Sequence, residues 1–364
     1  MHILFAGGGT AGHINPALAV AGYIKEQDPS VKISYIGTAK KLESVLVPRQ
    51  GYDFYTIDVA GFQRKISLKN IGRNVVAVYK MFASSNRARK LLKTLKPDIV
   101  VGTGGYVSGP VVREAQKLGI KTAIHEQNAF PGVTTKMVAE KADAVMLAMP
   151  EAEKYLKLNK KPVITGNPVR MELLKISKKE ARKKLGLSDK PLILSFGGSL
   201  GARRINEAVV GLAKWNQENQ KFHHIHGTGK TGYENFVSSV SSFELMDVRE
   251  YIDNMDVCMA AADLVICRAG AITLSELLAC GKPAILIPSP YVAENHQYHN
   301  GMTLKRAGAA EMLEEKDLTS ESLIELTKTL ISDKGRLEAM SFAASQNAIL
   351  DANERIYKVI KSLL

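Results

Sequence analysis

The sequences ILFAGGGTAGHIN at residues 3–15 and LILSFGGSLG at residues 192–201 decide the fold. Each is a short apolar run that ends in a glycine cluster, and a helical pattern follows each of them. Glycine lets the backbone turn tightly and approach a ligand, and the N terminus of the following helix presents unpaired N–H groups to an anion. We therefore expect two loops able to hold a diphosphate. The alternative is that these glycines only form tight turns.

Short β-branched runs recur between helical patterns through both halves of the chain. They lie at residues 3–6, 32–36, 98–101, 121–125, 144–147 and 162–165, and then at 192–196, 222–226, 264–267 and 284–288. Strands that alternate with helices form a parallel sheet covered by helices. The sequence predicts an α/β protein with two Rossmann-like domains, residues 1–166 and 167–350, facing a central cleft. A final helix at about residues 351–364 is expected to pack back on the first domain.

Length and composition favour a two-domain globular protein, with 364 residues of which 45% are hydrophobic and 23% charged. The spacing of Cys258, Cys267 and Cys280 fits neither a disulfide framework nor a zinc site. The N terminus has no basic leader, and no window of about 18 residues is free of charge. These features predict a cytoplasmic protein whose membrane contact, if any, is peripheral.

The net charge of +13 calls for an anionic partner, which is a nucleic acid, a lipid surface or a phosphorylated substrate. Ten cations and no acidic residue lie between Asp58 and Asp98. There an apolar series runs beside basic residues at helical spacing, as expected of a helix that sinks into an anionic membrane surface. The residues are Ile71, Val75, Tyr79 and Phe82, beside Arg73 and Lys80. The alternative is a core-facing helix with a solvated basic side.

Gly7, Gly9 and Gly12 satisfy the G-x-G-x-x-G pattern of nicotinamide dinucleotide sites. Such a site also needs an acidic residue near the end of the second strand to hold the ribose. That strand ends instead in Tyr35-Ile36-Gly37-Thr38. The sequence therefore disfavours a nicotinamide cofactor, and we expect no cofactor at all.

His13 directly follows the first glycine loop, where Asn15 and Pro16 resemble a helix cap and first turn. Imidazole titrates near neutrality, so His13 is a candidate general base or phosphate donor. The alternative is a histidine that only packs on a neighbour.

Transfer of a sugar from a nucleoside diphosphate requires stabilisation of the departing diphosphate by a metal or by fixed donors. The chain has no Asp-x-Asp element, and it offers Arg170, Ser199 and Arg268 instead, which predicts a metal-free site. Glu276 could hold ribose hydroxyls, although Thr273-x-x-Glu276 also matches a helix capping box. The clusters at residues 125–128 and 294–300 supply amides and imidazoles suited to sugar hydroxyls.

Several motifs together resemble the MurG family, the peptidoglycan N-acetylglucosaminyltransferases of the GT-B fold, over nearly the whole chain. The motifs are Gly8-Gly9-Thr10-Ala11-Gly12-His13, Gly104-Gly105-Tyr106, His125-Glu126-Gln127-Asn128, Gly166-Asn167-Pro168-Val169-Arg170, Gly197-Gly198-Ser199-x-Gly201-Ala202-Arg203, Arg268-x-Gly270-Ala271 to Glu276, and His296-Gln297. The resemblance implies inverting, metal-independent transfer of GlcNAc from UDP-GlcNAc to the 4-hydroxyl of a muramyl pentapeptide carried on undecaprenyl diphosphate.

The resemblance also assigns roles to individual residues. In the first half, Thr10, Ala11 and Gly12 would lie against the sugar nucleotide, His13 near the reacting hydroxyl or diphosphate, Asn128 at the transferred sugar, and Tyr106 and Glu126 toward the acceptor. In the second half, Arg170 and Ser199 would contact the nucleotide, Ile252 would contact the uracil and Glu276 would bind the ribose. The diphosphate would be bound by Ala271, Ile272, Thr273, Leu274 and Ser275, and the GlcNAc hydroxyls would be bound by Gln297. Ala11 and Ala269 depart from the family, which often carries glycine and serine there.

Two other functions fit parts of the sequence. A UDP-GlcNAc 2-epimerase would use the same sugar nucleotide on a similar fold without an acceptor. A nucleic-acid binder would fit the pI of about 9.4, but the aromatic content of 6% is low for a single-strand platform. We expect an anionic membrane surface, rather than nucleic acid, to be the macromolecular partner.

Overall fold

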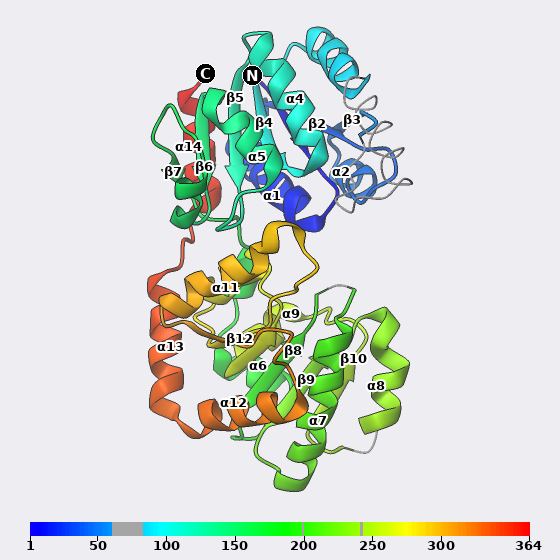
Figure 1. The fold of residues 1–364 in the computed structure, drawn as a ribbon, viewed down its shortest axis with the longest axis vertical. Coiled ribbons are helices and arrows are strands. Elements are labelled where there is room, and N and C mark those ends of the chain that lie inside the picture. Colours follow the sequence, from blue (N-terminus) through cyan, green and yellow to red (C-terminus); the bar gives the residue numbers. More distant parts are fainter. Residues whose placement is uncertain (60–82, 199, 241–242) are drawn as a thin grey trace. The chain divides into compact units, whose positions relative to one another are not determined.

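The computed structural model describes residues 1–59, 83–198, 200–240 and 243–364. Within them the chain divides into two compact units, each built around its own sheet (Figure 1). The first unit comprises Met1–Pro168 and Asp351–Leu364, and the second comprises Val169–Leu350. The expected class, a protein of two α/β domains with parallel sheets, is confirmed.

The described strands of the first unit form a seven-stranded parallel sheet in the order β3-β2-β1-β4-β5-β6-β7. The strands are β1 (His2–Gly7), β2 (Lys32–Gly37), β3 (Asp53–Thr56), β4 (Ile99–Gly104), β5 (Lys121–Glu126), β6 (Ala144–Leu147) and β7 (Val163–Ile164). The helices are α1 (Ala11–Gln27), α2 (Glu43–Arg49), residues 83–95, α4 (Gly105–Lys117), α5 (Val133–Val138) and α14 (Ala352–Ser362).

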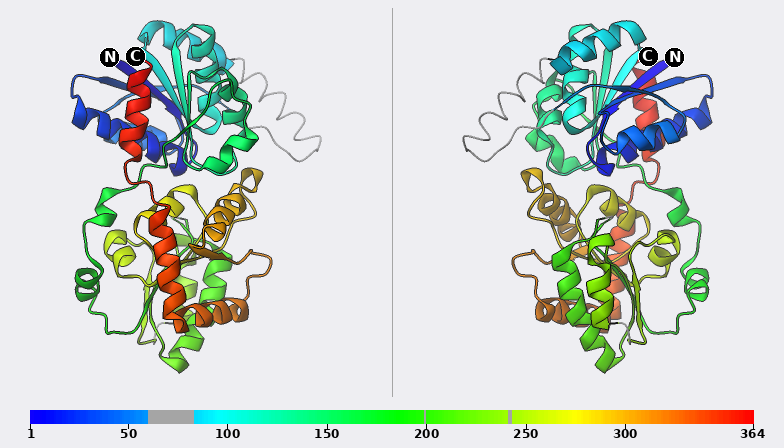
Figure 2. Two further views of the ribbon diagram at one scale, coloured as in Figure 1. Left: turned by 90° about the vertical axis from the view of Figure 1, so that its left-hand side faces the viewer. Right: turned by 90° about the vertical axis from the view of Figure 1, so that its right-hand side faces the viewer.

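Helices cover both faces of this sheet, because successive side chains of a strand point to opposite faces. Ile3 and Phe5 of β1 pack with α1 and α14, whereas Leu4 and Ala6 pack with α4 and with residues 83–95. The last helix is held by Ile356 and Ile360, both fully buried in the core of this unit. Figure 2 shows this C-terminal helix lying along the first unit, far in sequence from its neighbours.

The second unit contains a six-stranded parallel sheet in the order β10-β9-β8-β11-β12-β13 among its described residues. The strands are β8 (Leu192–Phe196), β9 (His223–Gly227), β10 (Met246–Arg249), β11 (Leu264–Cys267), β12 (Ala284–Leu286) and β13 (Ala310–Met312). Its helices are α6 (Lys178–Lys184), α7 (Arg203–Asn219), α8 (Tyr233–Val240), α9 (Met255–Ala261), α10 (Ala271–Ala279), α11 (His296–Arg306), α12 (Ser320–Ser332) and α13 (Lys334–Gln346). The edge strands β3, β10 and β13 lack a strong apolar pattern, and the sequence did not predict them.

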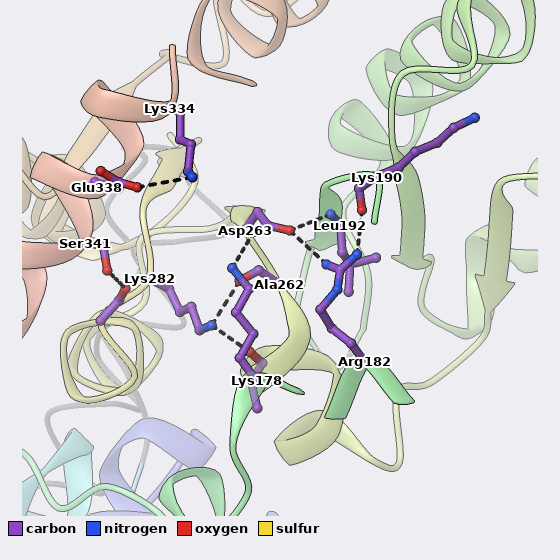
Figure 3. Close-up of polar contacts among 12 residues, drawn as sticks. Lys178, Arg182, Lys190, Leu192, Ala262, Asp263, Lys282, Lys334, Glu338 and Ser341 are labelled. Carbon is purple, nitrogen blue, oxygen red and sulfur yellow. Dashed lines mark hydrogen bonds and ion pairs between the residues drawn. The ribbon is translucent and has the colours of Figure 1, made fainter. Parts of the chain in front are cut away.

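A charged cluster ties the amino ends of β8 and β11 to α6 (Figure 3). Asp263 accepts a hydrogen bond from the backbone N–H of Leu192 at 2.7 Å and pairs with Lys178 and Arg182. Beside it, the ammonium of Lys282 donates to the carbonyls of Ala260 and Ala262 at 2.8 and 2.9 Å, at the end of α9. Because the loops that hold ligands lie at the opposite, carboxyl edge of a parallel sheet, this cluster is a structural one.

None of the helices in the described parts of the chain is both long enough and apolar enough to cross a bilayer.

Candidate active site

Three loops of the first unit lie along one edge of its sheet, where β1, β4 and β5 end. These strands are neighbours in the sheet, and the carboxyl ends of parallel strands lie along one edge. The loop after β1 packs directly on the loop after β4, since a Cβ on Gly105 would lie 2.2 Å from the carbonyl oxygen of Gly8. Gly105 has a φ of 76°, a left-handed conformation that favours glycine. Glycine at position 105 is thus needed for this close approach.

The first glycine loop rests on a fully buried carboxylate, Glu43 of α2. Its Oε2 accepts the backbone N–H of Gly9 at 3.1 Å, and its Oε1 accepts the N–H and hydroxyl of Thr38 at 3.1 and 2.8 Å. A Cβ on Gly8 would lie 2.4 Å from the carboxylate, so the glycine is required there. The N–H of Gly9 already donates to the Glu43 carboxylate. The geometry therefore disfavours the diphosphate-binding role expected of the first loop.

His13 lies in the first turn of α1, and its ring packs against the backbone of Gly104 and Gly105. Its Nδ1 lies 3.0 Å from the carbonyl oxygen of Gly8 and 3.2 Å from the hydroxyl of Thr10. Because a carbonyl can only accept, the contact assigns the proton of the neutral ring to Nδ1. Nε2 then keeps its lone pair, which is the tautomer that a general base needs.

The predicted start of this helix at Asn15 and Pro16 is wrong. Helix α1 begins at Ala11, with Thr10 at the N-cap position and Pro16 inside the helix. The earlier start places Ala11, Gly12 and His13 in the first turn, directly after the glycine loop.

Glu126 ends β5 and is buried among donors of its own loop. One carboxylate oxygen accepts the backbone and side-chain N–H groups of Asn128 at 3.1 and 3.0 Å. The other accepts the N–H of Gly132 at 3.2 Å and the hydroxyl of Thr135 at 2.5 Å. With both oxygens engaged, the geometry favours a positioning role for Glu126, which the family resemblance makes a catalytic residue on the acceptor side. Tyr106, in the first turn of α4, is 61% exposed.

Glu276 in the second unit forms an ion pair with Arg170, whose Nε lies 2.7 Å from Oε1. Glu276 is buried, whereas the guanidinium of Arg170 is exposed. The capping-box interpretation is wrong: Gly270 is the N-cap of α10, so Thr273 and Glu276 both lie inside the helix. Two of the residues for which the sequence predicted nucleotide contacts are therefore brought together.

The N terminus of α10 carries no side-chain cap and no acidic residue in its first turn. The first hydrogen bond within the helix runs from the N–H of Leu274 to the carbonyl of Gly270 at 3.0 Å. Amides of the preceding turn, including those of Ile272 and Thr273, make no such bond and present the positive end of the helix dipole. The hydroxyl of Ser275 donates to the carbonyl of Ala271 at 3.1 Å. The helix is thus suited to an anion such as a diphosphate.

Arg268, expected to stabilise the diphosphate, is instead mostly buried in contacts with its own unit. Its guanidinium donates to the carbonyls of Ile287 and Pro288 at 3.1 and 3.3 Å and pairs with Glu315. These contacts fix the end of β12, which precedes the polar cluster at residues 294–300. The geometry favours a positioning role for Arg268.

Two further residues predicted from sequence line the same edge of the second sheet. Gln297 is the second residue of α11. Its side-chain carbonyl oxygen accepts the N–H of Ser289 at 2.8 Å, which leaves its amide nitrogen as a donor suited to a sugar hydroxyl. Ile252 is buried, and a Cβ on Gly227 would lie 3.0 Å from its Cδ1.

A network of neutral groups supports the second glycine loop. Asn206 of α7 donates to the carbonyl of Thr228 at 3.0 Å, against which Gly201 packs so closely that a Cβ would lie 2.0 Å from the oxygen. The side-chain oxygen of Asn206 lies 3.2 Å from Nε2 of His226, and Ser195 lies 2.7 Å from Nδ1 of the same ring. Ser199 lies outside the described residues, and so do Ile71, Arg73, Val75, Tyr79, Lys80 and Phe82.

Sequence analysis missed Glu43 and Asn206, which hold the two glycine loops. Glu43 lies 34 positions after Gly9 and Asn206 lies just after the second loop, both in helices, and only the folded chain brings them beneath the loops. Within the described residues, no group of three or more histidine, cysteine, aspartate or glutamate side chains could hold a metal ion.

Comparison with known proteins identifies both halves of the chain. Residues 3–147 match the glycosyltransferase family 28 N-terminal domain, and residues 192–356 match its C-terminal domain. A protein of Acetivibrio thermocellus is 47% identical over all of this chain and 98% of its own length, and one of Clostridioides difficile is 42% identical over 99% and 88%. Both carry the name "UDP-N-acetylglucosamine--N-acetylmuramyl-(pentapeptide) pyrophosphoryl-undecaprenol N-acetylglucosamine transferase".

Solved structures give the same result for the fold. The crystal structure of Acinetobacter baumannii MurG is similar with a TM-score of 0.80 at 30% identity, over 99% of both chains. A UDP-GlcNAc 2-epimerase from Neisseria meningitidis bound to UDP-GlcNAc is similar with a TM-score of 0.66, but at 14% identity. The epimerase is therefore similar in fold alone, whereas the Acetivibrio and Clostridioides proteins share much of the sequence as well.

Proposed function

The chain belongs to glycosyltransferase family 28, and from this premise we propose that it performs the reaction for which its relatives are named. It transfers N-acetylglucosamine from UDP-GlcNAc to the muramyl pentapeptide linked through a diphosphate to undecaprenol, the step that converts lipid I to lipid II. The reaction inverts the anomeric centre and forms a bond to the 4-hydroxyl of the muramyl sugar.

The second unit binds the donor in this proposal. The uncapped N terminus of α10 faces the diphosphate, and the exposed guanidinium of Arg170 adds positive charge. Glu276 holds the ribose hydroxyls, Ile252 packs near the uracil, and the amide nitrogen of Gln297 donates to a GlcNAc hydroxyl. Fixed dipoles and a guanidinium stabilise the departing UDP, so the reaction needs no divalent ion.

The first unit supplies the base. Nε2 of His13 takes the proton of the acceptor hydroxyl as its oxygen bonds to the anomeric carbon, and the bond to UDP breaks with its electron pair remaining on the diphosphate. Glu126 holds Asn128 toward the transferred sugar, and Tyr106 lies on the acceptor side. The observation that carries this assignment is the 3.0 Å contact between Nδ1 of His13 and the Gly8 carbonyl, which favours the tautomer of the neutral ring whose lone pair is on Nε2.

An acceptor-dependence assay tests the proposed reaction against the epimerase alternative. The protein is incubated with UDP-GlcNAc alone and then with added lipid-linked muramyl pentapeptide, and both UDP and UDP-ManNAc are measured. We expect UDP to be released only when acceptor is present. Formation of UDP-ManNAc without acceptor would establish the epimerase and overturn the transferase.

We further propose that the basic segment between Asp58 and Asp98 binds the anionic surface in which the lipid acceptor lies. Residues 83–95 of this segment form a helix that buries Leu91 and Leu92 and exposes Arg87, Arg89 and Lys90. A cationic face turned to solvent is suited to anionic headgroups. The described residues support only this basic face, because the apolar series lies outside them.

Vesicle sedimentation tests the membrane proposal. Binding to phosphatidylglycerol vesicles is compared with binding to phosphatidylcholine vesicles and to duplex and single-stranded DNA. We expect anionic vesicles to bind best, and Arg87→Glu with Lys90→Glu to weaken that binding. The matched control is Lys214→Glu in the second unit. Tighter binding to DNA than to anionic vesicles would overturn the proposal.

A further inference from the structure

One peptide group connects Glu43 to His13. The N–H of Gly9 donates to Oε2 of Glu43 at 3.1 Å, and the carbonyl of Gly8, which belongs to the same peptide group, lies 3.0 Å from Nδ1 of His13. In a trans peptide the N–H and C=O point in opposite directions, so the two contacts lie on opposite sides of the group. The peptide therefore has an anion on its donor side and an imidazole on its acceptor side.

We propose that Glu43 is a positioning residue for the transfer reaction, because through the Gly8–Gly9 peptide it fixes the tautomer of His13 and strengthens it as a base. The inference rests on the function proposed above. An anion that accepts the N–H polarises the peptide and makes its carbonyl oxygen a stronger acceptor, since hydrogen bonds in a chain reinforce one another at low dielectric. A stronger acceptor holds the proton on Nδ1 and stabilises the imidazolium that forms when Nε2 takes the proton.

The surroundings of both groups fit this role. Glu43 is fully buried and is held in place by the N–H and hydroxyl of Thr38, so its position does not depend on ligand. The His13 ring faces the backbone of Gly8, Gly104 and Gly105 and the Thr10 hydroxyl, and none of these groups carries a charge. In place of a carboxylate in direct contact with the His13 ring, the buried carboxylate of Glu43 therefore acts on the ring through the Gly8–Gly9 peptide group.

Kinetics of Glu43→Gln test the inference. The variant keeps the shape of the side chain and removes its charge. We expect kcat to fall about 10-fold, by analogy with the cost of losing a group that orients a metal-binding histidine, with the KM for UDP-GlcNAc within about 3-fold of the wild type. The acid limb of the pH–kcat profile moves to lower pH, because the imidazolium loses its distant anion. Glu43→Asp, which keeps the charge, restores the wild-type profile in part.

A matched control separates this effect from loss of stability. Glu114 of α4 is also a buried carboxylate of the first unit, paired with Lys117, and it does not contact the glycine loop. Glu114→Gln should leave the pH–kcat profile unchanged. In a double-mutant cycle, Glu43→Gln should have little further effect once His13 is replaced by glutamine, because the two act as one unit. Independent, multiplicative effects would overturn the inference.

Nitrogen NMR of the full chain with ¹⁵N-labelled histidine gives a readout that does not depend on turnover. The His13 signals are assigned by their loss in His13→Gln. We expect the Nδ1–H tautomer in the wild type and a shift toward the Nε2–H tautomer in Glu43→Gln. An unchanged tautomer, with GlcNAc transfer intact in the wild type, would overturn the role of Glu43 alone. If the tautomer of His13 changes in Glu43→Gln but the wild type transfers no GlcNAc, the proposed function is overturned, whereas the effect of Glu43 on His13 is supported.

Discussion

The two glycine loops look alike in sequence but rest on different supports. Beneath the first lies a buried anion, Glu43, which accepts the N–H of Gly9. Beneath the second lies a neutral network of Asn206, His226 and Ser195. An anion under a loop disfavours a second anion above it, whereas neutral supports leave that position open to one. The difference supports our proposal that the first unit supplies the base and the second binds the diphosphate.

Replacement of His13 should give the largest effect and would break the comparison most directly. We expect His13→Ala to lower kcat at least about 100-fold, the usual range for a general base, with little change in UDP-GlcNAc affinity. Initial rates and calorimetric titration with UDP-GlcNAc measure the two quantities. A variant with normal turnover would remove His13 from the mechanism.

Replacement of Glu276 should sharpen the assignment of the donor to the second unit. Glu276→Ala removes the charged acceptor beside Arg170, and hydrogen bonds to charged groups contribute about 1.5–3 kcal/mol, so we expect the Kd for UDP-GlcNAc to rise roughly 10- to 100-fold. Circular dichroism should show the fold unchanged. Glu234→Gln, in α8 of the same unit, serves as the control and should bind normally. Unchanged affinity in Glu276→Ala would refute its role at the nucleotide.

The neutral network of the second unit should make that unit sensitive to acid. Burial lowers the pKa of His226 to about 3 and that of His224 well below its ordinary value. Both rings stay neutral when folded, so below about pH 6.5 only the unfolded chain gains protons. Stability should therefore fall as pH drops, by about 1.4 kcal/mol per pH unit for each ring.

Urea unfolding between pH 7 and 5 measures this effect, followed through the fluorescence of Trp215, the single tryptophan, which stacks on Phe222 with ring centroids 6.3 Å apart. His224→Gln removes one titrating ring and should reduce the pH dependence by about 1.4 kcal/mol per pH unit. His2→Gln, in the first unit, should leave the tryptophan-detected slope unchanged. Equal slopes in the wild type and His224→Gln would contradict the assignment of neutral rings.

Removal of divalent ions should have the smallest effect. It tests whether the fixed groups of the second unit are enough to stabilise the departing UDP. We expect turnover with EDTA to stay within about 2-fold of turnover with added Mg²⁺, because helix amides and Arg170 stabilise the departing UDP. Abolition of turnover by the chelator would show that the second unit depends on a metal.

Much of the fold could be predicted because the information is local. Apolar runs such as residues 192–196 and 264–267 are buried on both faces, so their composition alone marks them as central strands. The edge strand β13 at Ala310–Met312 carries no such signal, since one of its sides is unpaired. Candidate residues such as His13 and Glu276 could be predicted for the same reason, because each belongs to a short motif that contains glycine.

The sequence by itself determined the two α/β units, the paired glycine loops and the candidate base, since each depends on short-range patterns of burial and backbone freedom. The tertiary structure decided what those residues can do. In the folded chain Glu126 and Arg268 are held by internal contacts, and Arg170 pairs with Glu276. Glu43 lies 34 positions from Gly9 in the sequence but accepts its backbone N–H. The reason is physical: a hydrogen bond or an ion pair depends on distance in space, and that distance is set by packing rather than by neighbouring residues.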